Sequence, residues 1–171
     1  MAKKSKGFQE LLQDKNSLKR SIKVFQKLIE RVKNTASDVD PEIVFEQENT
    51  AKMSEILHIY VEPYLLPSDN YGVRKTVLDI GILGWNAAIC PEHLKQKLIN
   101  DFYQDFFAEY PDELKQEIKT WIDVLIERKK KYFANINRMI LSCKIEETED
   151  SYDLLVFSTM LPDEDLTSQE T

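Results

Sequence analysis

The residues best suited to nucleophilic chemistry in this chain lie together in the short segment Cys90–Pro91–Glu92–His93. A thiol at the start of a helix feels the positive end of the helix dipole, which lowers its pKa and raises its reactivity. Cys90 directly precedes a proline, which favours a first helical turn, and His93 is near enough to act as a base. The segment is thus compatible with a thiol enzyme, although a buried thiol at a corner between helices explains it more simply.

The same residues are also the chain's best metal ligands. His58 and Glu62 are four residues apart on one helical face, and zinc accepts imidazole, thiolate and carboxylate ligands. Because the chain has only two histidines and two cysteines, a structural zinc site would need nearly all of them. We expect no metal and no cofactor, and a metal site would have to use Cys90, His93 and His58.

A basic cluster next to aromatic residues could contact nucleic acid. It comprises Arg128, Lys129, Lys130 and Lys131, and Tyr132 and Phe133 follow it directly. Basic side chains beside exposed aromatics can hold phosphates and stack on bases. The overall pI of about 5.0 argues against a net basic field, and a solvated, dipole-complementing helix end is the simpler interpretation.

Charge is distributed unevenly along the 171 residues. Residues 1–34 contain ten basic and three acidic residues, a net of +7, whereas the remainder carries a net of −14. From Ile145 to the end there are nine acidic residues and no basic one. Such asymmetry predicts an acidic partner for the N-terminal segment, either in another molecule or in the chain's own acidic part.

Residues 8–34 combine this basic charge with a heptad-like apolar seam. The seam, interrupted by Lys15, consists of Phe8, Leu11, Leu18, Ile22, Phe25, Ile29 and Val32. A basic ridge with a spacing of four overlaps it, formed by Lys15, Lys19, Lys23, Lys27 and Arg31. Apolar spacings of three and four predict a long helix that can pair with another helix. Like charges four residues apart oppose that helix, so we expect something negative to face the ridge.

Other helices and a hairpin must position these groups. Apolar periodicity and proline positions predict further helices over residues 48–61, 71–89, 91–109 and 111–133, and period-two patterning predicts strands over residues 138–146 and 152–160. Asp40–Pro41 resembles a helix start. Gly81 and Gly84 inside an apolar helix predict close helix packing, with Asn86 as a polar lock. The expected fold is a mainly α, single-domain bundle of five or six helices with a C-terminal β-hairpin.

Composition limits the classes of function. Glycine is sparse and no phosphate-binding glycine motif occurs, no stretch is long and apolar enough for a membrane span, and no secretory signal follows the basic N-terminus. Two cysteines predict reduced thiols and a cytoplasmic location. We expect a flexible basic segment at 1–7, one domain at 8–161 and a disordered acidic tail at 162–171.

These observations favour a non-enzymatic, adaptor-like interaction protein. Its basic helix over residues 8–34 would bind a protein partner or a second copy in a homodimer, using the apolar seam and the basic ridge. The first alternative is a nucleic-acid-associated accessory factor that uses the same basic helix together with Arg128–Lys131. The second is a thiol- or metal-dependent enzyme at Cys90 and His93.

Overall fold

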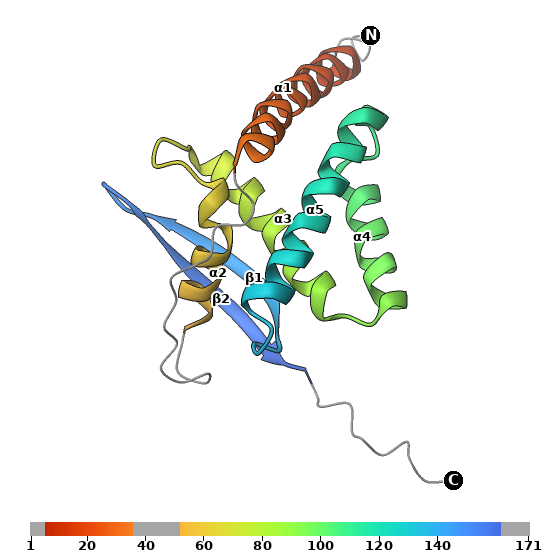
Figure 1. The fold of residues 1–171 in the computed structure, drawn as a ribbon. Helices are drawn as coiled ribbons and strands as arrows, with labels where there is room; N and C mark the ends of the chain where they lie inside the picture. Colours follow the sequence, from red (N-terminus) through yellow and green to blue (C-terminus); the bar gives the residue numbers. More distant parts are fainter. Residues whose placement is uncertain (1–5, 36–51, 162–171) are drawn as a thin grey trace.

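A computed structural model describes residues 6–35 and 52–161, with side chains from Lys15 onward. In this part of the chain, five α-helices and one 3-10 turn pack with a two-stranded antiparallel hairpin (Figure 1). The elements are α1 (Lys6–Asn34), α2 (Met53–Val61), η1 (Glu62–Tyr64), α3 (Tyr71–Ile89), α4 (Glu92–Phe106), α5 (Asp112–Tyr132), β1 (Arg138–Glu147) and β2 (Tyr152–Met160). The predicted fold class is therefore confirmed. No helix in the described ranges has the length and apolar character needed to cross a membrane.

The predicted boundaries agree closely with the observed ones for α3 and β2. Helix α4 ends earlier than expected, at Phe106, because Phe107 leaves the helical conformation and its side chain is buried in the core. The flexible segment predicted for 1–7 is wrong at Lys6 and Gly7, which already belong to α1. The rest of that segment, the Asp40–Pro41 helix start, the first residues of the helix predicted at 48–61 and the tail at 162–171 lie outside the described residues.

Helix α3 is the centre of the fold, and its two inner glycines let its neighbours approach closely. A Cβ atom at Gly81 would lie 2.5 Å from Val61 Cγ1 of α2. A Cβ atom at Gly84 would lie 2.7 Å from Leu125 Cβ of α5 and 3.2 Å from the Tyr60 hydroxyl. Both glycines have ordinary helical backbone angles, so space rather than conformation requires them. The prediction of close helix packing at these glycines is confirmed.

Asn86 and Trp85 of α3 fasten the hairpin to the helices. Asn86 Nδ2 donates to the Ile140 carbonyl at 2.8 Å, and the Ile140 N–H donates to Asn86 Oδ1 at 2.9 Å. Trp85 Nε1 donates to the Arg138 carbonyl at 2.8 Å. These bonds satisfy main-chain groups on the outer edge of β1, just before an irregularity between Ile140 and Ser142 that leaves Leu141 unpaired. The predicted polar lock is therefore confirmed, and its partner is the strand edge.

We expect Gly84→Ala to lower the free energy of unfolding by about 1–3 kcal/mol, because the added methyl group meets the Leu125 Cβ atom, which cannot rotate away. Gly72→Ala is the matched control in the same helix: the nearest atom to its new Cβ is Asn70 Oδ1 at 3.4 Å, so it should stabilise by up to about 1 kcal/mol. Urea unfolding measures both changes. Equal effects of the two substitutions would contradict the close approach of α3 and α5.

Asn86→Ala should cost about 2–3 kcal/mol, because both main-chain groups of Ile140 then lose their partner at a half-buried position. Asn86→Asp keeps the acceptor and should cost less than Asn86→Ala. The measurement is urea unfolding, together with amide hydrogen exchange at Ile140. Unchanged protection of the Ile140 amide in Asn86→Ala would show that the lock does not hold this strand.

Candidate functional site

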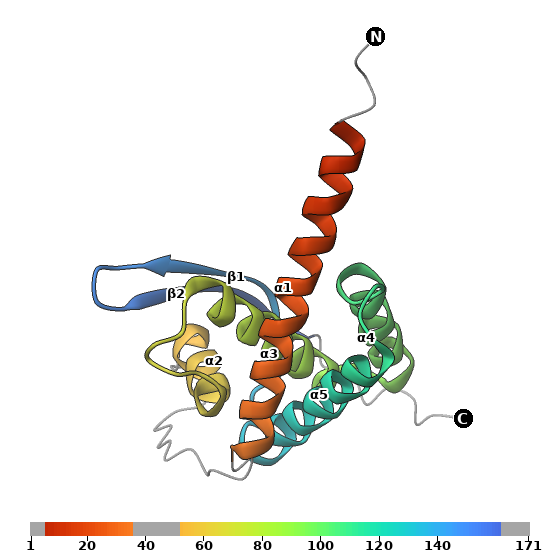
Figure 2. The same ribbon diagram turned by 90° about the horizontal axis from the view of Figure 1, so that it is seen from above.

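Helix α1 has an anchored C-terminal part and a projecting N-terminal part. Phe25, Leu28 and Ile29 are buried in the core. The Phe25 ring meets the rings of Phe107 and Tyr110 edge-on, with centroids 5.1 Å and 5.5 Å away. Figure 2 shows the helix crossing the body over α3 and α5 and then continuing well beyond it toward its N-terminus. The core thus holds a long helix that extends into solvent.

The apolar seam predicted for a partner is largely used inside the chain's own domain. Phe25 and Ile29 are buried, and three further seam residues, Leu18, Ile22 and Val32, pack partly buried against the core. The prediction that Phe25 and Ile29 bind a partner is therefore wrong, because neither side chain is accessible. The side chains of Phe8 and Leu11 lie outside the described residues.

The basic ridge is divided in the same way. At its C-terminal end, the Arg31 guanidinium forms a two-bonded ion pair with Asp69, at 2.7 Å and 2.8 Å, and also donates to the Tyr64 carbonyl at 3.1 Å. Burial raises the pKa of the Asp69 carboxyl, but the hydrogen bonds from Arg31 and from the Leu66 N–H outweigh it and lower the pKa below its ordinary value. Arg31 therefore holds α1 on the loop before α3, which corrects its assignment to a partner-binding surface.

The remaining four ridge residues face solvent. They are Lys15, Lys19, Lys23 and Lys27, and all four are exposed. Within the described part of the chain, none of the four forms an ion pair with a carboxylate. By contrast, Lys33 near the helix end pairs with Glu117 of α5 at 2.6 Å. The unpaired lysines form one row along the helix, and we call this row the α1 ridge.

The basic cluster proposed for nucleic acid is mostly internal. Arg128 and Lys129 have only 3% and 2% of their surface exposed. Arg128 Nε donates to the Tyr60 carbonyl at 3.0 Å, and Lys129 Nζ donates to the Phe133 carbonyl at 2.7 Å. These two residues cannot contact phosphates, so the prediction is wrong for them. Lys129 lies four residues after Leu125 and seven after Ile122, and this spacing could have shown that it faces the core.

The two other members of that cluster are exposed. Lys130 pairs with Glu127 of the same helix at 3.4 Å, and the Lys131 ammonium lies 5.0 Å from the centroid of the Tyr132 ring. They complement the negative end of the α5 dipole. The helix end therefore has a structural explanation that needs no nucleic acid.

Lys129 is a buried amine with unusual electrostatics. Its ammonium group lies 4.8 Å from the centroid of the Trp85 ring, and burial lowers its pKa to about 8. Below this pH the folded protein must keep a charge in an apolar environment. Between pH 8 and the ordinary value near 10.5, the unfolded chain binds a proton that the folded chain has released, so stability rises with pH.

We expect deprotonation of the buried Lys129 amine to raise the free energy of unfolding by up to about 3 kcal/mol between pH 8 and 10.5. In Lys129→Met this rise should be absent, and at pH 7 the variant should be at least as stable as the wild type, since the Phe133 carbonyl keeps the Ile136 N–H as a donor. Urea unfolding gives the free energy of unfolding of the wild type and of Lys129→Met at several pH values. The contributions of other titrating groups cancel in the difference between the two proteins. If the two free energies changed in parallel with pH, Lys129 would not have a lowered pKa.

The thiol and metal hypotheses gain no geometric support. Cys90 is the C-cap of α3, and Pro91 rather than Cys90 is the N-cap of α4. Burial raises the pKa of the Cys90 thiol, opposite to the direction that a nucleophile needs. His93 is exposed on α4, and the His58 ring lies beside the Tyr152 ring at a tilt of 45°, with centroids 5.9 Å apart. In the described ranges, no group of three His, Cys, Asp or Glu side chains is arranged to hold a metal ion.

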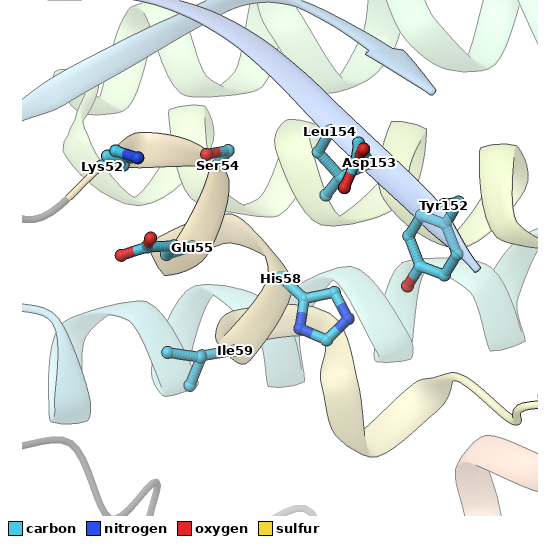
Figure 3. Close-up of a pocket in the computed structure, with 8 residues that line it drawn as sticks. All are labelled: Lys52, Ser54, Glu55, His58, Ile59, Tyr152, Asp153 and Leu154. Carbon is cyan, nitrogen blue, oxygen red and sulfur yellow. The ribbon is translucent and has the colours of Figure 1, made fainter. Parts of the chain in front are cut away.

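An open cleft of about 480 Å³ separates α2 from the start of β2 (Figure 3). On the helix side it is lined mainly by Lys52, Glu55, His58 and Ile59, and on the strand side by Tyr152, Asp153 and Leu154. Figure 3 shows the His58 and Tyr152 rings next to each other at one end. The sequence analysis missed this cleft, because it joins segments about a hundred residues apart and no local pattern marks it.

Comparison with known proteins gives no assignment for this architecture. No family model matches the chain, and neither a curated protein nor a solved structure matches it.

Proposed function

We propose that this protein is a non-enzymatic interaction protein that presents the α1 ridge to an acidic surface of a partner protein. The single observation that carries the proposal is the exposed row Lys15–Lys19–Lys23–Lys27 on a helix that projects from an otherwise acidic chain (Figure 2). A rigid element that reaches away from the body can contact a partner without rearrangement of the core. A helix clamped at one end by a buried core is such an element.

The way α1 is held explains why its charge is available. Phe25, Leu28 and Ile29 anchor it in the core, and the Arg31–Asp69 pair orients its C-terminal end. The α1 ridge takes no part in this anchor, and within residues 15–35 and 52–161 its lysines form no ion pair with a carboxylate, which supports their availability to an external acidic group. Four like charges at this spacing destabilise an isolated helix by a few tenths of a kcal/mol per neighbouring pair, a cost that an acidic partner would reverse.

A protein partner agrees better with the charges than nucleic acid does. With Arg128 and Lys129 buried, a nucleic-acid interface would retain the α1 ridge and, from the α5 cluster, only Lys130 and Lys131, while the acidic remainder of the chain would repel phosphates. An acidic helix or loop of a protein partner presents fewer charges and can approach the ridge alone. The two unpaired cysteines are compatible with a reducing, cytoplasmic setting.

We expect the double charge reversal Lys19→Glu/Lys23→Glu to weaken binding of a labelled acidic helical peptide about tenfold, because exposed ion pairs contribute up to about 1 kcal/mol each and the reversal adds repulsion. The matched control is Lys97→Glu/Lys119→Glu, which reverses two exposed lysines on α4 and α5 and should have little effect. Fluorescence anisotropy at low and high salt measures the affinity, and labelled duplex DNA serves as the competing probe.

Equal weakening by the two double variants would contradict the proposal, since only net charge would then matter. Tighter, ridge-dependent binding of the DNA than of the peptide would also contradict it and would favour the nucleic-acid alternative.

A further inference from the structure

The two edges of the hairpin differ. On the edge of β1, Trp85 and Asn86 occupy the main-chain groups of Arg138 and Ile140. Strand β2 pairs with β1 alone, and among the described residues no main-chain group of β2 is bonded to another element on its other side. An unpaired strand edge is a ready template for another strand.

The pairing of Ile140 with Ser158 shows which groups of β2 face this open edge. Because Asn86 takes both main-chain groups of Ile140, this pair exchanges no hydrogen bonds across the hairpin, and the Ser158 N–H and C=O point away from β1. Strand geometry alternates, so the main-chain groups of Val156 and Leu154 point the same way. The open edge therefore offers evenly spaced donors and acceptors along the whole strand.

The open edge also lacks the usual protection. Soluble proteins commonly place charged residues on free edges. Strand β1 carries four charged residues, Arg138, Lys144, Glu146 and Glu147, whereas β2 carries only Asp153 at its start. On the outward face of β2, Leu155 is 47% exposed and Phe157 is 55% exposed. A charge-poor edge with apolar side chains beside it is suited to pairing.

We infer that β2 pairs antiparallel with β2 of a second copy of this chain about a twofold axis at Val156, giving a continuous four-stranded sheet. In this register Leu155 lies opposite Phe157 of the partner subunit, and Phe157 lies opposite the partner's Leu155. Asp153 lies opposite the partner's Thr159, so no like charges meet. This self-complementarity is the reason for choosing a second copy over an unrelated strand, since a closed twofold interface must match its own surface.

In this β2–β2 register, a side chain of the second copy would also occupy the cleft between α2 and β2. Met160 is 62% exposed at the end of β2, and pairing about Val156 places it opposite Tyr152 of the partner subunit. Tyr152 and Leu154 form the strand side of the cleft, and Ile59 adds an apolar patch on α2 (Figure 3). Each copy's Met160 would thus enter the cleft of the other, so each cleft is completed only by the second copy.

The helices leave room for this arrangement. Helix α2 contacts β2, and the His58 ring lies beside the Tyr152 ring at the start of the strand (Figure 3). Because paired antiparallel strands run in opposite directions, the two copies of α2 lie at opposite ends of the joint sheet. The α1 ridge takes no part in the pairing, so this inference does not depend on the proposed function.

The test is sedimentation velocity of the full chain from about 1 µM to about 100 µM, which brackets the micromolar Kd of a modest interface. We expect a concentration-dependent dimer. The single variants Leu155→Glu and Phe157→Lys should each raise the dimer Kd at least about tenfold. The double variant Leu155→Glu/Phe157→Lys should recover most of the affinity, because each new glutamate faces a new lysine of the partner.

Two further variants distinguish pairing of the strand edges from non-specific association through exposed apolar residues. Ser158→Pro removes a donor only from the open edge, so it should abolish the dimer while monomer stability changes little. Phe106→Glu removes an aromatic side chain that is 62% exposed on α4 and should leave the dimer unchanged, as should Lys19→Glu/Lys23→Glu.

A monomeric wild type over the whole concentration range would overturn the inference. So would a dimer that Phe106→Glu weakens as much as Leu155→Glu, or a double variant that fails to recover, because the register would then be wrong. If Lys19→Glu/Lys23→Glu alone dissolved the dimer, assembly would run through the α1 ridge instead.

Discussion

The whole architecture depends on how closely other elements approach α3. Two positions without side chains, Gly81 and Gly84, bring α2 and α5 within contact of its backbone. The next two residues, Trp85 and Asn86, then reach past the helices and hold β1 through three hydrogen bonds. One short segment therefore joins both helical neighbours and the hairpin. Its dense apolar composition and its polar residues serve packing, and no catalytic group is needed to explain them.

Cations that are bonded within the fold, whether fully or partly buried, are the second constraint. Arg31, Arg128 and Lys129 all place their charge where main-chain carbonyls, a carboxylate or an aromatic ring can receive it. Such groups are costly to bury unless they are paired or hydrogen-bonded. Because these residues are bonded inside the protein, the row of basic charge that can reach a partner lies on the solvent-facing side of α1. The division of charge between inside and outside is thus what points to a surface for interaction.

The two proposed interaction surfaces are the α1 ridge and the open edge of β2. The α1 ridge is polar and extends into solvent, whereas the open edge of β2 is apolar and close to the body. They differ in chemistry. The α1 ridge attracts acidic groups at a distance, and salt screens this attraction, whereas the open edge requires direct contact with another strand. A protein that assembles through the strand edge would display two α1 ridges, and two linked ridges would bind a repeated acidic partner more strongly than one.

Local patterns in the sequence were enough to predict the helices and the hairpin. The apolar period along residues 71–89 and the alternation along residues 152–160 are properties of neighbouring residues, and they determined these elements nearly to the residue. The glycines and Asn86 were likewise recognisable, because a glycine inside an apolar helix makes room for a close neighbour and a buried amide there needs hydrogen-bond partners. What the sequence alone could not determine was which side chains share a neighbour across the fold. Only the tertiary structure placed Phe25 and Ile29 in the core, turned Arg128 and Lys129 inward, raised the pKa of the Cys90 thiol and left β2 with an open edge. The physical reason is that burial and pairing depend on segments distant in the chain, so the same lysine is a surface charge or a core residue according to what packs over it.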